Sequence, residues 1–271
     1  MTKPQQAYPS DLNDTEMKII APYLPPTKIE GRPREHEWCE ILNGIFYVAR
    51  AGCAWRMLPH EFPPWKTVYH YFREWRLEGR WEQVNTALRQ AIREKDKRQP
   101  QPSAIILDSQ SVKTAEGGED RGYDAGKNIF GRKRHLAVDT LGLVVLVVVT
   151  AASVQDRDGA MQILQPLFDR IKHSKYSRWC RLKLIWADGG YRGELVDWVK
   201  RKLGWALEIV KKLGDQVGFQ VLPKRWIVER TFAWLTRSRR LSKDYERLPQ
   251  TSEAFIYVVM TRLMLKRLAH S

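Results

Sequence analysis

The sequence has few cysteines and no long hydrophobic segment. Its three cysteines, Cys39, Cys53 and Cys180, form no Cys-x-x-Cys pair, which argues against a disulfide framework or a structural zinc site. The longest apolar run, from Leu141 to Ala152, is too short to cross a bilayer as a helix. The first twenty residues contain acids and no apolar run, so no secretory signal is visible. These features predict a cytoplasmic protein without a membrane partner.

Positive charge is in clear excess. The 271 residues include 46 Lys and Arg against 31 Asp and Glu, a formal net charge of +15, and 43% of them are hydrophobic. Residues 1–98 hold 16 basic and 13 acidic side chains, so +12 of the excess lies in residues 99–271. Because summed positive charge attracts phosphate backbones of any sequence, we expect a nucleic acid partner. A basic surface that serves only solubility is the alternative.

A polar, proline-bearing segment at residues 99–103 divides the chain. Before it, apolar residues recur at helical spacing, which predicts a small all-α, helix-turn-helix-like domain over residues 1–98, with helices near 14–24, 38–51, 65–78 and 81–95. The third helix presents Lys66, Arg73 and Arg76 away from its aromatic stripe, as a helix in a DNA major groove would. A solvated face of a helical bundle would give the same pattern.

Residues 104–271 have the pattern of an α/β domain. Short β-branched runs near residues 103–108, 135–139, 143–150, 182–188 and 206–210 predict strands, and amphipathic stretches near 156–172, 193–202, 225–239 and 251–269 predict helices. The segment Asp139 to Gly142 has the composition of a hairpin turn. Three strands followed by alternating helices and strands predict a mixed sheet.

Three acids stand at positions suited to chemistry. Asp108 and Asp188 each end a predicted strand, and Glu229 interrupts an apolar helix. Each alone has a structural explanation: a cap or turn for the aspartates, and an ion pair with Arg225 for Glu229. Together, three carboxylates can hold two Mg²⁺ ions roughly 3.5–4 Å apart for phosphoryl chemistry. An oxygen-only donor set without histidine suits Mg²⁺ better than zinc.

Other polar residues are expected to be structural or to face DNA. Asp139 fits the hairpin turn, and Asp156 and Asp158 fit the first turn of a helix. His135 is expected to pack within a strand. Asp124 belongs to a segment that also contains Lys127 and Arg132 to Arg134, which we expect to face DNA.

Several long motifs in order resemble bacterial insertion-sequence transposases of the DDE, RNase H-like class, in the superfamily of insertion sequences four and five. The resemblance covers nearly the whole chain and rests on Leu12–Pro26, Gly31–Arg34, Gly52–Pro59, Phe62–Trp65, Leu107–Lys113, Gly131–Leu136, Gln155–Ala160, Ala187–Tyr191 and Trp226–Leu235. It implies that residues 104–271 form an RNase H-like catalytic domain. It also implies that Asp108, Asp188 and Glu229 are the metal-binding triad, with Mn²⁺ as a possible substitute for Mg²⁺.

The resemblance further implies cleavage at the ends of the element and attack of a 3′-hydroxyl on target DNA, by a homodimer assembled on DNA in the bacterial nucleoid. Leu222 and Thr236 stand where the family's helix signature has Tyr and Lys. A nuclease or resolvase without strand transfer and an inactive, transposase-derived DNA-binding protein are the alternatives. The expected DNA contacts are Arg225, Arg230, Arg237, Arg239, Arg240, Lys243, Lys127, Arg132, Lys133, Arg134, Lys66, Arg73 and Arg76.

Overall fold

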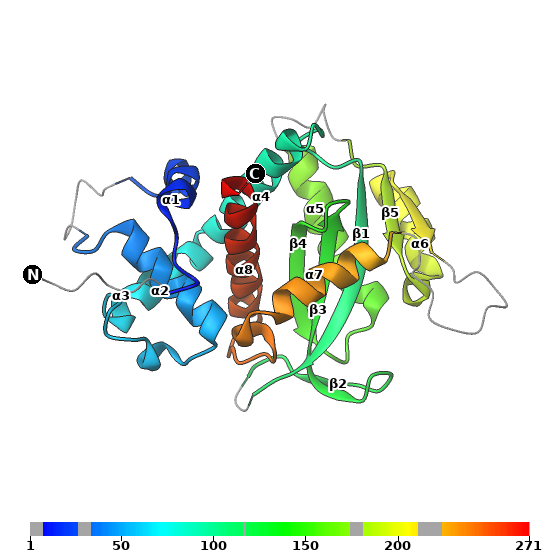
Figure 1. Ribbon diagram of the computed structural model, residues 1–271. Coiled ribbons are helices and arrows are strands. Elements are labelled where there is room, and N and C mark those ends of the chain that lie inside the picture. Colours follow the sequence, from blue (N-terminus) through cyan, green and yellow to red (C-terminus); the bar gives the residue numbers. More distant parts are fainter. Residues whose placement is uncertain (1–7, 27–33, 116–117, 174–180, 211–223, 271) are drawn as a thin grey trace, which may run out of the picture.

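The N-terminal part of the protein is helical, as expected (Figure 1). The computed structural model describes residues 8–26, 34–115, 118–173, 181–210 and 224–270. Its first helices are α1 (Asp14–Ile20), α2 (Trp38–Ala51), α3 (Trp65–Leu77) and α4 (Arg80–Lys95). Asn13 and Glu16 form a reciprocal capping box that starts α1. Gly52 ends α2 with a left-handed φ of 74°.

The described part of the chain forms one mixed sheet, which confirms the expected α/β class. Its strands are β1 (Ala104–Lys113), β2 (Gly122–Asp124), β3 (Ile129–Asp139), β4 (Val144–Ala151), β5 (Leu184–Ala187) and β6 (Ala206–Ile209). The order is β2-β3-β1-β5-β6, and β4 also pairs with β3. Strands β1, β5 and β6 are parallel, whereas β3 is antiparallel to β1, β2 and β4.

Helices cover both faces of this sheet. The later helices are α5 (Asp156–His173), α6 (Glu194–Trp198), α7 (Trp226–Thr236) and α8 (Pro249–Ala269). Side chains alternate along a strand, so Ile105 and Leu107 of β1 pack with α5 and α6, whereas Ile106 packs on the side of α4, α7 and α8. The triad helix α7 crosses the sheet on that second face (Figure 1).

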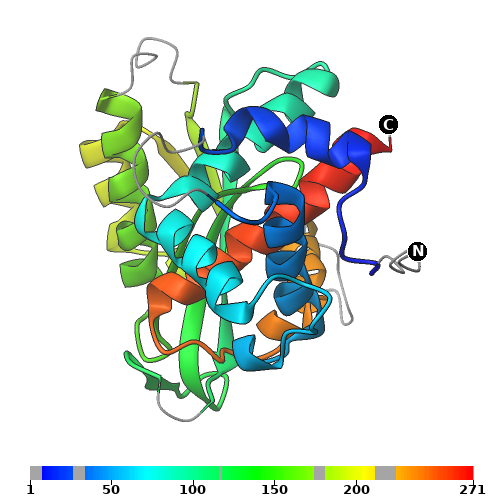
Figure 2. The same ribbon diagram turned by 90° about the vertical axis from the view of Figure 1, so that its left-hand side faces the viewer.

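Helix α8 lies between the sheet and the N-terminal helices (Figure 1), which lie in front of it in the view of Figure 2. One hydrophobic cluster contains residues of α2, α3, α4, α8 and the facing side of the sheet. The hydroxyl of Tyr257 and the carboxylate of Glu253 accept hydrogen bonds from the backbone N–H groups of Val147 and Val149 on β4. Helix α8 thereby satisfies backbone donors of a strand that would otherwise be an open edge.

One detail of the strands differs from the expectation. Strand β1 continues past Asp108 to Lys113, so this acid lies within the strand and not at its end. The polar residues Ser109 to Ser111 extend the strand because they pair with His135, Arg134 and Lys133 of β3.

Within the described ranges, no helix is both long and apolar enough to cross a membrane.

Candidate active site

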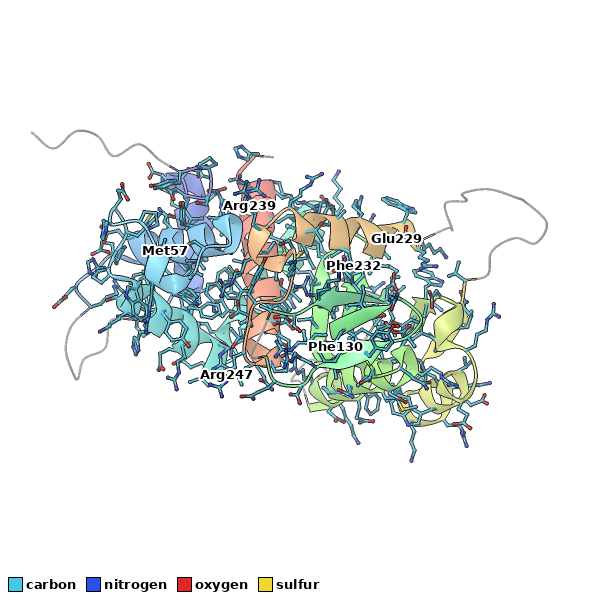
Figure 3. The ribbon with its side chains drawn as sticks, turned by 90° about the horizontal axis from the view of Figure 1, so that it is seen from below. Met57, Phe130, Glu229, Phe232, Arg239 and Arg247 are labelled. Carbon is cyan, nitrogen blue, oxygen red and sulfur yellow. The ribbon has the colours of Figure 1, made fainter. Side chains whose placement is uncertain are left out.

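The three predicted acids meet at one place. Asp108 lies on β1, and Asp188 directly follows the parallel neighbour β5. The pairing of Ile106 with Trp186 brings the two aspartates level with each other. Glu229 lies in the first turn of α7, which packs across β1 (Figure 3). The exposed fraction of the side chain rises from 13% for Asp108 to 52% for Glu229, so the site opens toward the glutamate.

Arg225 occupies the space between the three acids. Its guanidinium nitrogens lie 4.0 Å from Asp108 Oδ2, 3.3 Å from Asp188 Oδ2 and 3.4 Å from Glu229 Oε1. The pKa of Asp108 is raised to about 6, chiefly by burial and also by the Asp188 charge, against the opposing effects of the Ser109 N–H and Arg225. The positive charge of Arg225 therefore does not fully offset the cost of burying the ionised carboxylate of Asp108.

The donor chemistry fits a divalent cation. All three side chains offer carboxylate oxygens, which Mg²⁺ prefers, and they already surround a cationic group. In the described ranges, no group of three His, Cys, Asp or Glu side chains is placed to hold an ion. Arg225 lies in the space that an ion shared by these carboxylates would need. The residues fit the ion in charge and donor type, and its binding would require Arg225 to move.

A fourth carboxylate borders the site. Asp156, the first residue of α5, accepts a 2.7 Å hydrogen bond from Ser109 Oγ and lies 3.2 Å from Lys133 Nζ. A Cβ on Gly190 would lie 3.3 Å from Asp156 Oδ2 and 3.1 Å from Asp188 Oδ1, so Asp156 adjoins the turn after β5. It does occupy the first turn of a helix, as the sequence predicted. Its proximity to the triad depends on how α5 packs, which spacing alone did not indicate.

Several predicted DNA contacts are instead buried. Arg132 is fully buried, pairs with Asp244 and donates to three backbone carbonyls. Arg134 donates to the carbonyls of Leu241 and Lys243. The expectation that both face DNA is wrong, because β3 is covered on both faces and these side chains hold residues 241–247 against it.

Lys133 and Arg240 are also engaged inside the protein. Lys133 is buried and binds Asp124, Asp156 and the carbonyl of Val154. Arg240 pairs with Glu246 at 2.6 Å and donates to the carbonyl of Cys53. Neither presents a free cation to DNA, which corrects the expectation for both.

The other candidates are at least partly accessible. Arg230 is half-buried, donates to the Leu141 carbonyl and lies over the rings of Trp226 and Trp234. Arg76 is half-buried on α3. The exposed candidates are Lys66, Arg73, Lys127, Arg237, Arg239 and Lys243. They lie on α3, on the turn between β2 and β3, and beyond the C-terminal end of α7.

Comparisons with known proteins point to one family. Residues 99–264 match the family model "Transposase DDE domain", and residues 12–85 match "Putative transposase of IS4/5 family". The "Putative transposase for insertion sequence element IS402" of Burkholderia cepacia is 33% identical over 129 residues, 46% of this chain and 59% of that protein. The "Insertion element IS402 uncharacterized 16.2 kDa protein" of the same organism is 29% identical over 117 residues, 41% of this chain and 78% of that protein. No solved structure matches.

Proposed function

We propose that this chain, which belongs to the family described as "Transposase DDE domain", moves an insertion sequence by cutting and joining DNA. It binds the terminal inverted repeats, cleaves the DNA at the ends of the element and joins the freed 3′-hydroxyl to target DNA. The observation that supports this most directly is the convergence of Asp108, Asp188 and Glu229 from three separate elements to within 4.0 Å of one guanidinium. A structural ion pair does not need three carboxylates for one arginine.

The proposed roles follow from where the side chains are held. Asp108 is fixed within the paired strand β1, and Asp188 is held by a 2.8 Å hydrogen bond from the Gly190 N–H to its own Oδ1. Glu229, on the exposed side of α7, completes the set. These residues would hold two Mg²⁺ ions, or Mn²⁺ in their place. The metal supplies positive charge that stabilises charge developing on the phosphate oxygens.

The helical part supplies the proposed recognition of DNA. Helix α3 buries Val68, Phe72 and Trp75 and leaves Lys66 and Arg73 exposed on its other side. These cations suit contacts with the phosphates that flank a major groove. Joining two ends of an element to one target needs two active sites, so we expect a homodimer on DNA.

The triad is tested by removing one carboxylate charge at a time. Asp108→Asn and Glu229→Gln are expected to lower the rate of Mg²⁺-dependent nicking by at least about 10³-fold, because cation binding is worth several kcal/mol of transition-state stabilisation. The substrate is a duplex of the inverted repeat that flanks this gene. Fluorescence anisotropy should show near-normal binding of the same duplex.

Asp158→Asn is the matched control, because Asp158 is an exposed acid in the first turn of α5. Undiminished nicking by Asp108→Asn would refute the triad. Joining is measured separately, with pre-cut ends and a supercoiled target plasmid. Cleavage without joining would make the protein a nuclease and not a transposase.

A further inference from the structure

A basic groove lies where α2, the end of α7 and α8 meet. Its volume is about 450 Å³, and Trp234 lines it together with the cations Arg50, Arg237, Arg262, Lys266 and Arg267. A neighbouring hollow of about 290 Å³ shares Arg50 and Arg237 and continues toward Arg239. The two hollows together, called the basic groove below, form a continuous cationic surface.

The charge in this groove is offset only in part, by acids that lie outside its lining. Among the described residues that line it, none is acidic. Arg262 is paired with the buried Glu16 of α1 at 2.6 Å. Burial and the charges of Arg262 and Arg50 lower the pKa of Lys266, against the opposing charge of Glu16. Burial and the charge of Arg230 lower the pKa of Arg267, against the opposing charges of Asp139 and Asp96. Like charges held this closely are stabilised when an anion binds among them.

The basic groove is aligned with the triad along α7. Glu229, Ala233 and Arg237 are exposed and lie at helical spacing on one side of that helix. Eight residues of helix correspond to roughly 12 Å along its axis. One strand of a duplex advances about 3.4 Å per nucleotide. Figure 3 shows Glu229 and Arg239 near opposite ends of α7, so a DNA strand whose phosphate lies at the triad would reach the groove within a few nucleotides.

We propose that the basic groove binds the phosphodiester backbone of the DNA strand within a few nucleotides of the phosphate at the triad. Arg237 and Lys266 are two of its exposed cations, and we assign them to phosphate binding. The proposal rests on the proposed function for its alignment with a cleaved phosphate. It adds a site formed jointly by the helical part and the α/β part, because Arg50 comes from α2 and donates to the carbonyl of Arg237 at the end of α7.

The test is a double substitution that removes two charges and keeps much of the side-chain volume. We expect Arg237→Gln with Lys266→Gln to weaken binding of a fluorescein-labelled duplex of arbitrary sequence, measured in EDTA. The slope of log K against log[KCl] should become shallower by roughly 1.8, because about 0.9 is lost per phosphate contact. The matched control is Lys200→Gln with Lys202→Gln, two exposed lysines beside α6 on the opposite face of the sheet. Equal melting temperatures establish that both variants fold.

An unchanged salt slope, or an equal change in the control, would overturn the proposal. Inorganic phosphate could raise the melting temperature of the wild type and not that of the variant while the DNA salt slope stays unchanged. That result would show a site for free anions only and would overturn the proposal. Neutral methylphosphonate linkages scanned along a pre-cut end test the position. Neutral linkages at one or two positions within a few nucleotides of the cut should weaken DNA binding by the wild type and leave binding by the double variant unaffected.

Binding in EDTA involves no cleavage, so the two hypotheses fail separately. If Asp108→Asn retains full nicking while the salt slope behaves as expected, the triad is refuted and the groove stands as a DNA site. If nicking is lost while the slope is unchanged, the groove is refuted and the triad stands.

Discussion

Arg225 shows at the scale of a single residue how three neighbouring carboxylates are held together. Three carboxylates that face one another would repel, and the guanidinium placed among them offsets that repulsion. Its Nε is buried and has no hydrogen-bond partner among the described residues, so the contact is electrostatic and imperfectly aligned. Such a contact can be exchanged for a better cation.

We therefore predict that Arg225→Gln lowers the melting temperature in EDTA and enlarges the rise in melting temperature on adding Mg²⁺. The amide removes the positive charge, so the carboxylates gain more from the ion than they do in the wild type. Thermal shift with and without Mg²⁺ measures both effects. Arg192→Gln, an exposed arginine beside the turn after β5, is the control. A smaller Mg²⁺ response in Arg225→Gln would show that this arginine helps to assemble the ion site.

Glu253 gives a pH dependence of stability. Its carboxyl group accepts a 2.9 Å hydrogen bond from the Val149 N–H, and burial raises its pKa to about 7. Between the ordinary pKa of glutamate and about pH 7, the folded protein therefore keeps a proton on Glu253 that the unfolded chain has released. The free energy of unfolding should fall as the pH rises from the ordinary glutamate range to about 7.

Glu253→Gln keeps an acceptor oxygen for the Val149 N–H and removes the charge. We predict that the variant is more stable than the wild type above pH 7, by on the order of 2 kcal/mol. The two proteins should differ little in acid, where the wild-type carboxyl group is neutral. Urea unfolding across this pH range measures the difference. Glu94→Gln, at an exposed position of α4, is the control. Parallel pH curves for the wild type and Glu253→Gln would contradict the prediction.

At the scale of elements, the start of α5 is held very close to β3. A Cβ on Gly159 would lie 2.0 Å from His135 Cε1, and the ring is buried with its Nε2 3.0 Å from Thr150 Oγ1. The expected packed role of His135 is confirmed. Helix α5 also carries Asp156, so this contact fixes the distance between that carboxylate and the triad.

Gly159→Ala is predicted to destabilise the protein by about 1–3 kcal/mol, because the added methyl group overlaps a ring that has no space to move. The control is Gly126→Ala, where a Cβ would meet nothing closer than 3.5 Å. Chemical denaturation of both variants compares the two sites. Equal stabilities of the two variants would show that α5 and the His135 ring move apart without lowering the free energy of unfolding.

The elements were largely predictable from the sequence, and the fold is the expected RNase H-like α/β arrangement. Periodicity located the helices, and the Asp139–Gly142 turn correctly joined β3 to β4. Asp108 and Asp188 meet because β1 and β5 are neighbouring parallel strands. The burial of Arg132 and Arg134 was not predictable, because their partners lie more than one hundred residues away. The proximity of Asp156 to the three acids was missed because it depends on how α5 packs against the sheet.

At the scale of the whole molecule, α8 joins the two parts that the sequence separates at residues 99–103. Phe255 and Met260 are fully buried, and the Phe255 ring stacks on Phe72 of α3 with centroids 4.6 Å apart. The helix also packs on α4 and β4, and Arg262 binds Glu16 of α1. The helical part and the sheet therefore share one core, although the assignment of residues 1–98 and 104–271 as domains stays a prediction.

A shared core predicts cooperative unfolding. Differential scanning calorimetry of the full chain should show one transition, with the calorimetric enthalpy equal to the van't Hoff enthalpy. Residues 99–271 produced alone should lack that transition, because the removed helices would expose the apolar sides of α8 to water. Phe255→Ala in the full chain, expected to cost about 3–5 kcal/mol, should lower this one transition without splitting it. The prediction would be contradicted by two transitions of which Phe255→Ala shifts only one. That result would show that the helical part folds independently and that the core does not fix its position relative to the triad.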